Sequence, residues 1–166
     1  MCNTKKLSNN VYQFDGFGFY NSLEEPNYWQ EHGHEEIQIT LPQYNAQAWM
    51  EYQSPAGKRL FKQIKPGEVF LVGQSTPHQL DWQQKAELTL FYLHPQFFSS
   101  ILNDSIENYQ LEIRDCFSLT NDALIQQVGA IFRHLCNLDN GSERLYIESL
   151  ANLLAVHLIK NYLNCK

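Results

Sequence analysis

The sequence has few positive charges, no paired cysteines and no long apolar run. Of its 166 residues, 12 are Lys or Arg and 18 are Asp or Glu, which gives a formal net charge of −6. DNA binding begins with basic side chains that neutralise phosphates, so a chain of this charge is a poor nucleic-acid binder by itself. The cysteines form no C-x-x-C pair, which excludes a zinc knuckle or a thioredoxin-like motif.

No stretch approaches the ~18 apolar residues that a membrane span needs. Polar residues follow Met1 and Cys2, so the sequence shows no secretory leader. We therefore expect a cytoplasmic protein with reduced thiols and no membrane partner. Repeats, a P-loop, paired catalytic carboxylates and a Ser-His-Asp signature are also missing, which leaves no support for those kinds of catalysis.

What the sequence does contain is a series of short alternating runs. With 43% hydrophobic and 13% aromatic residues the chain is globular and leans toward β structure. The runs predict a hairpin within residues 8–20, turning at Asp15-Gly16, and strands at 36–41, 46–53, 59–64, 69–72 and 87–93. Residues 21–34 are expected to be irregular. About seven short strands at close spacing favour a β-sandwich or barrel.

The pattern becomes helical after residue 93. His94-Pro95 is expected to start a short helix, and a strand-like piece follows at 110–113. A longer helix is expected from Thr120 or Asn121 to the Asp139-Asn140-Gly141 stop, and a last helix from its cap at Ser142. A short connection favours an antiparallel helix pair.

The last helix is apolar over most of its circumference. One of its faces is expected either to be buried within the monomer or to form a homodimer interface. The residues assigned to that interface are Ile147, Leu150, Leu154 and Leu158.

Three histidines carry the most chemical pattern in the chain. His32 and His34 stand at i and i+2, so they project to the same face of a strand. His78 follows a polar loop and could supply a third nitrogen ligand for a divalent metal. The alternative is that all three are ordinary polar residues at the mouth of a barrel.

The spacing of these histidines resembles the two cupin motifs, G-x5-H-x-H-x3,4-E-x6-G and G-x5-P-x-G-x2-H-x3-N. His32-Gly33-His34 matches the H-x-H core, and His78 stands eleven residues after Gly67, as the second motif requires. Gln38 occupies the position of the metal-binding glutamate. The loss of that carboxylate resembles cupins that bind rather than catalyse, so no metal cofactor is favoured, and His32, His34 and His78 are the ligands if there is one.

A second resemblance covers more of the chain. The segments 31–39, 66–82 and 146–158 look like parts of the amino-terminal domain of AraC-type transcription regulators. In that family a cupin barrel senses a small effector, a helix pair dimerises, and a basic helix-turn-helix domain of about one hundred residues binds DNA. That last domain is not in these residues, so we expect DNA to be a partner only through a missing C-terminal domain and the chain to be a fragment.

These observations combine into one expectation of fold. It is mainly β with C-terminal α: a cupin-like barrel, that is a double-stranded β-helix or jelly-roll, in residues 1–93, then an antiparallel helix pair in 94–166, packed as one domain. The expected function is effector sensing and dimerisation without catalysis. The alternatives are a metal-dependent cupin enzyme, an oxygenase or isomerase, and an interaction module with no ligand.

The barrel interior is where a small-molecule effector is expected to bind. Aromatic rings suit stacking on an organic ligand, and histidine and amide groups suit the orientation of its polar atoms. The candidate effector-binding residues are His32, His34, Gln38, Trp49, Tyr52, His78, Trp82 and Tyr92.

Overall fold

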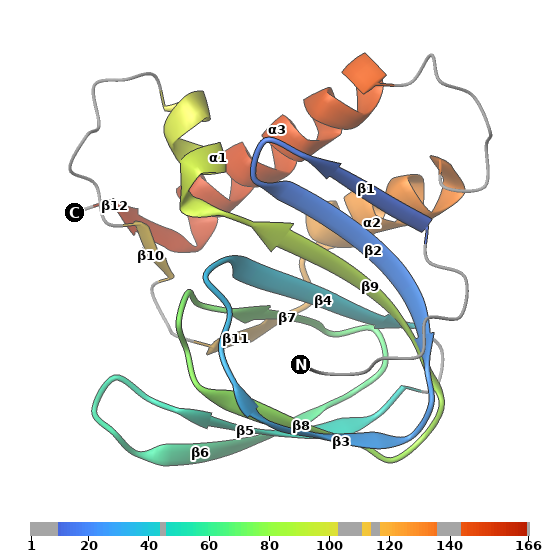
Figure 1. Ribbon diagram of the computed structural model, residues 1–166, viewed down its shortest axis with the longest axis vertical. Helices are drawn as coiled ribbons and strands as arrows, with labels where there is room; N and C mark the ends of the chain where they lie inside the picture. The colour runs from blue at the N-terminus through green and yellow to red at the C-terminus, as the bar shows by residue number, and fades with distance from the viewer. Residues whose placement is uncertain (1–9, 44–45, 103–110, 114–116, 136–143, 166) are drawn as a thin grey trace.

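The computed structural model describes residues 10–43, 46–102, 111–113, 117–135 and 144–165 (Figure 1). Two antiparallel sheets face each other across the barrel. The first has the order β1 (Asn10–Phe14), β2 (Phe17–Glu24), β9 (Ala86–Leu93), β4 (Ile37–Gln43), β7 (Val69–Val72), β11 (Phe117–Thr120). The second has the order β3 (Asn27–His32), β8 (His78–Trp82), β5 (Ala48–Gln53), β6 (Arg59–Ile64). A short pair, β10 (Leu111–Ile113) and β12 (Leu163–Cys165), lies apart.

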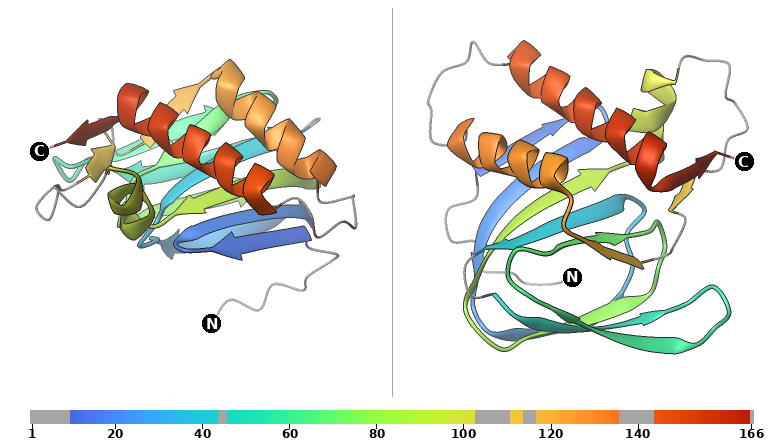
Figure 2. Two further views of the ribbon diagram at one scale, coloured as in Figure 1. Left: turned by 90° about the horizontal axis from the view of Figure 1, so that it is seen from above. Right: turned by 180° about the vertical axis from the view of Figure 1, so that it is seen from behind.

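Three helices cover the six-stranded sheet on the side away from the barrel interior. They are α1 (Pro95–Ile101), α2 (Ala123–Leu135) and α3 (Arg144–Asn161), and Figure 2 shows α2 and α3 side by side above the strands. No described helix is long and apolar enough to cross a membrane. The expected fold class, mainly β with C-terminal helices, is confirmed.

The central strands of the six-stranded sheet, β4 and β7, are buried on both faces. Along β4, Ile37, Ile39 and Leu41 join the core beneath the helices. Gln38 and Thr40, which alternate with them, are also buried and face the other sheet. One sheet therefore has its helix-side face in one apolar core and its barrel-side face in another.

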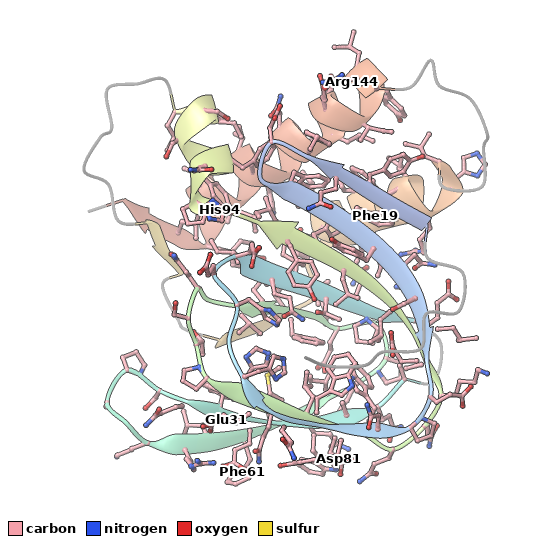
Figure 3. All side chains as sticks on the ribbon, viewed as in Figure 1. Phe19, Glu31, Phe61, Asp81, His94 and Arg144 are labelled. Atoms are coloured by element: carbon pink, nitrogen blue, oxygen red, sulfur yellow. The ribbon has the colours of Figure 1, made fainter. Side chains whose placement is uncertain are left out.

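The aromatic residues concentrate in the core between sheet and helices. Phe132 of α2 stacks on Phe19 of β2 with ring centroids 4.9 Å apart, and it meets Phe17 and Phe91 at 5.6 and 5.3 Å. Figure 3 places the labelled Phe19 between the sheet and the helices. Burial of such rings is worth roughly 1.5–3 kcal/mol each, so this cluster ties the helices to the barrel.

Local turn chemistry follows the sequence closely. Asp15 and Gly16 both have positive φ, 37° and 83°, as a two-residue hairpin turn of the primed type requires. Pro95 begins α1, and the Nδ1 atom of His94 accepts a hydrogen bond from the Gln96 amide. The hairpin within 8–20 and the short helix at His94-Pro95 are therefore confirmed.

Four strands of the described residues were not expected: β3, β8, β11 and β12. Residues 21–34, expected to be irregular, contain the end of β2 and all of β3, because both sides of β3 carry polar residues that hide its alternation. The loop expected to end at His78 leads directly into β8, where His78, Leu80 and Trp82 alternate as buried residues. Strand β11 also joins the sheet, beside β7, from beyond residue 93.

The helix pair runs antiparallel, and the start of α2 is clamped to the end of α3. Asp122, rather than Thr120 or Asn121, caps α2 by accepting a hydrogen bond from the Ile125 amide at 3.0 Å. Its other carboxylate oxygen lies 2.7 Å from Nε2 of His157 and accepts a hydrogen bond from the Tyr162 hydroxyl at 2.6 Å. The expected helix boundaries at 139–142 lie outside the described residues.

The assignment of the dimer interface was wrong. Ile147, Leu150, Leu154 and Leu158 are at most 7% exposed because they pack in the core against the six-stranded sheet. The periodicity could not separate the two faces of α3, since apolar residues occupy most of its circumference. The apolar residues that α3 does expose are Leu145, Tyr146, Leu153 and Val156.

Candidate metal and ligand site

Three histidines meet at one end of the barrel. His32 ends β3 and pairs with His78, the first residue of β8, while His34 follows two residues after His32. A register shift between Trp29 and His32 bends β3 just before the cluster. The nitrogen atoms that could bind a metal lie within 4.8 Å of one another. The ring centroids of His32 and His78 are 4.4 Å apart.

Hydrogen bonds fix which ring nitrogen is free in His32 and His78. Nδ1 of His78 lies 2.9 Å from the Thr76 carbonyl oxygen, and Nδ1 of His32 lies 2.7 Å from the Gln30 carbonyl oxygen. A carbonyl oxygen only accepts, so both Nδ1 atoms carry the proton and both Nε2 atoms keep a lone pair. Backbone hydrogen bonds of this kind orient metal-binding histidines.

Burial keeps two of these rings neutral. Burial lowers the pKa of His78 to about 4; the hydrogen bond to Thr76 opposes this, and repulsion from His32 and His34 adds to it. Burial is also the main cause that lowers the pKa of His34, followed by repulsion from His32, while Glu36 acts in the opposite direction. A metal binds the neutral imidazole, so these rings are prepared to act as ligands near pH 7.

Gln38 lies inside the barrel, as expected. Its side chain is 2% exposed, and its amide nitrogen donates to the Thr40 hydroxyl at 3.0 Å. Its Oε1 has no hydrogen-bond partner among the described residues. Its backbone pairs with Tyr92, whose ring contacts His34 with centroids 5.4 Å apart. A buried oxygen acceptor thus sits at the sequence position where cupins carry a carboxylate ligand.

The three other interior aromatics are placed as expected. Tyr52 pairs in register with His78, and Trp82 is 1% exposed at the far end of β8. Trp82 Nε1 and His78 Nε2 are both buried without a partner among the described residues. Burial is the largest cause that raises the pKa of Tyr92, and Tyr20, Glu36 and Glu24 raise it further.

Trp49 does not line the barrel, and its assignment to the pocket was wrong. Its side chain is 46% exposed, whereas its neighbours Ala48 and Met50 are buried. Trp49 pairs in register with Asp81, which points away from the barrel in Figure 3. Ala48 pairs in register with Trp82, and both are buried in the core inside the barrel.

A cavity of about 670 Å³ opens beside His34 along the inner face of β2. It reaches His94 at the base of α1, which Figure 3 labels. Sequence reasoning missed several of its walls, although the alternation of Tyr20, Ser22 and Glu24 could have shown them. Its central lining residues are Tyr20, Ser22, Glu24, Trp29, Glu36 and Tyr92.

The three histidines fit a divalent transition metal by their chemistry. Imidazole nitrogen suits zinc, copper, iron and nickel, and three protein ligands leave coordination positions for other molecules. The strongest single observation is Nε2 of His78, because a buried acceptor without a partner costs free energy unless something binds it.

Comparisons with known proteins add little. No protein-family model matches the chain, and no curated protein does. Solved structures of oxalate decarboxylase from Bacillus subtilis align with part of it. One, from work on the Mn(II) centres of that enzyme, is 19% identical over 52% of this chain and 23% of the other, with a TM-score of 0.44. Another, at pH 4.6, is 17% identical over 48% and 21%, with a TM-score of 0.43. This chain thus spans less than a quarter of those proteins.

Proposed function

We propose that the barrel binds a small molecule with the help of a divalent transition-metal ion held by His32, His34 and His78. The convergence of three imidazoles within 4.8 Å carries this proposal. When bound, the ion supplies a Lewis acid to which an oxygen or nitrogen atom of the small molecule coordinates. The protein orients His32 and His78 through backbone carbonyls, and burial keeps His34 and His78 unprotonated.

The role that this binding serves is, in our proposal, regulatory. Gln38 gives a neutral amide where metal-dependent cupin enzymes carry a carboxylate, which supports binding over catalysis. The resemblance of segments 31–39, 66–82 and 146–158 to AraC-type regulators supports effector sensing. DNA would then be bound by a basic domain outside these residues, and the remaining interior candidates Tyr52, Trp82 and Tyr92 would contact the effector.

A second copy of the chain is the proposed partner of the helical subdomain. The residues first assigned to the dimer interface are buried within the chain. We therefore place the interface at the exposed apolar residues of α3, Leu145, Tyr146, Leu153 and Val156. Exposed apolar side chains on one helix suit a symmetric contact between identical subunits.

Metal analysis tests the central part of the proposal. Protein purified without a histidine tag and dialysed against zinc, manganese, iron or nickel should retain close to one ion per chain. His78→Ala and the more exposed His32→Ala should each lose it, and circular dichroism should show that they fold. The control is His134→Ala, an exposed histidine on α2 outside the cluster. A parent protein that retains none of these metals contradicts the proposal.

A metal-dependent enzyme, an oxygenase or isomerase, is the second candidate. The observation in its favour is the cavity beside His34, which leaves space for a substrate next to the proposed ion. Turnover of a bound compound by the metal-loaded protein, lost in His78→Ala, would favour this candidate over the sensor.

A further inference from the structure

The cavity beside His34 has an unbalanced charge. Three acidic residues, Asp15, Glu24 and Glu36, line it, and none of the described residues that line it is Lys or Arg. Glu24 and Glu36 are partly buried, so water screens their charge less than at the surface. They lie at opposite ends of the cavity: Glu24 pairs in register with Ala86, whereas Glu36 precedes Ile37, which pairs with Leu93 at the other end of β9.

Aromatic rings stand between these carboxylates. Tyr20 and Tyr92 meet edge to face, with centroids 5.5 Å apart and an interplanar angle of 83°. The rings of Tyr92 and His34 meet at an interplanar angle of 69°. Trp29, on β3 of the four-stranded sheet, meets the His32 ring at 71°. Near-perpendicular rings turn different faces and edges toward one space. The electron-rich face of an aromatic ring attracts a cation, and tryptophan and tyrosine do so best.

Unsatisfied polar groups in and beside the cavity point the same way. The Ser22 hydroxyl is buried without a partner among the described residues and lies on the cavity wall. Gln38, next to Tyr92 in the sheet, carries a buried free carbonyl oxygen. A carbonyl or carboxylate oxygen can only accept, and a hydroxyl can accept as well as donate. The unmet demand is therefore mainly for hydrogen-bond donors.

A second metal ion does not explain these carboxylates. Across the part of the chain that the structure describes, only His32, His34 and His78 gather closely enough to hold an ion. Glu24 and Glu36 belong to no such group: Glu24 ends β2, and Glu36 directly precedes β4. The cavity extends from one to the other, so an organic cation with an extended body fits it better than a bare ion.

We propose that the cavity selects a small organic cation, an ammonium group on an apolar or aromatic body. The ammonium lies beside Glu24 and the hydroxyl of Ser22, which alternate on one face of β2, and the body packs on Tyr20, Trp29 and Tyr92, toward Glu36 at the other end of the cavity. This inference names the ligand class of the proposed binding function and rests on the barrel being a binding site, but not on the metal.

Three compounds of one shape and different charge test the inference. We expect calorimetry to show that 2-phenylethylamine binds, that the neutral 2-phenylethanol binds at least about tenfold more weakly, and that phenylacetate does not bind. A charge-assisted hydrogen bond accounts for a difference of this size. The affinity for the amine should also fall as salt rises.

Variants assign the effect to Glu24. Glu24→Gln should weaken the binding of 2-phenylethylamine roughly tenfold, Glu36→Gln should weaken it less, and neither should change the binding of 2-phenylethanol. The matched control is Glu25→Gln, beside Glu24 in sequence but exposed and paired with Lys85 at 2.6 Å. Equal affinity for amine and alcohol, preference for phenylacetate, or no binding of the amine at millimolar concentration overturns the inference.

The same samples separate this inference from the metal proposal. Amine binding and metal content are measured before and after treatment with a chelator. Amine binding that persists in protein that never holds a metal leaves the cation site standing and rejects the metal centre. Protein that binds a metal but shows no selectivity for the amine supports the metal centre and rejects the cation site.

Discussion

The substitution Gln38→Glu tests whether position 38 faces the proposed metal. It puts a carboxylate where the side chain is 2% exposed and where an amide oxygen lacks a partner. In metal-free protein the buried charge is costly, and the group can avoid the charge by taking up a proton. Protonating a carboxyl of ordinary pKa near 4.3 at pH 7 costs about 3.7 kcal/mol, which sets the ceiling. The Thr40 hydroxyl can donate to the new group, so we expect a loss of roughly 1–3 kcal/mol.

The metal should reverse this loss. If the ion neutralises the introduced carboxylate, the metal-bound protein is not destabilised by the buried charge. The free energy lost in the metal-free protein then appears as tighter metal binding. A penalty of about 1–3 kcal/mol corresponds to an affinity roughly 5- to 150-fold higher. The melting temperature should therefore fall by about 2–4 °C per kcal/mol in chelator and rise above that of the parent in excess metal.

Thermal unfolding by circular dichroism and metal competition against a coloured chelator measure both effects. Gln63→Glu, the same chemical change at an exposed position of β6, is the control and should alter neither quantity. Unchanged or weaker metal binding in Gln38→Glu would refute the reasoning, since a buried carboxylate that faces the ion cannot fail to attract it.

Three further predictions concern acid, the helix surface and packing. Because burial lowers the pKa of His78 to about 4, the unfolded chain binds a proton between pH 6.5 and 4 that the folded chain does not. The free energy of unfolding of the metal-free protein, measured in urea, should therefore fall by on the order of 3 kcal/mol as the pH drops over that range. The fall should be smaller in His78→Gln. Leu153→Asp should leave stability unchanged and yield monomers by light scattering, whereas Leu154→Asp, at 0% exposure, should unfold the chain. Gly129→Ala should lower the free energy of unfolding by roughly 1–3 kcal/mol, because its Cβ would lie 2.8 Å from Leu41 Cδ2. Urea unfolding measures this loss, and an unchanged midpoint would show that Leu41 moves freely.

Local chemistry made much of the barrel predictable. The Asp15-Gly16 turn, the break at Ser54–Gly57 and the clean alternation of β4 and β9 each depend on neighbours in sequence. The motif spacing predicted that His32, His34 and His78 could act together. The strands that bring them together were not predicted, because β3 and β8 were not expected and His34 lies beyond the end of β3.

What the sequence could not supply was the choice between two apolar faces. Trp49 and Met50 are both apolar, and only the folded structure shows that Ala48 and Met50 are buried while Trp49 is 46% exposed. The same holds for α3, where Leu153 and Leu154 are equivalent by composition and only the sheet beneath distinguishes them. Contacts between residues distant in sequence settle such choices.

One face of strand β9 lines the cavity, and its other face packs against the helices. Tyr92 reaches the cavity, while its neighbours Phe91 and Leu93 pack beneath α2 and α3. Adjacent residues on a strand are about 3.3 Å apart, and close-packed interiors transmit displacement rather than absorb it. The cavity and the core beneath the helices are therefore separated by the thickness of one sheet.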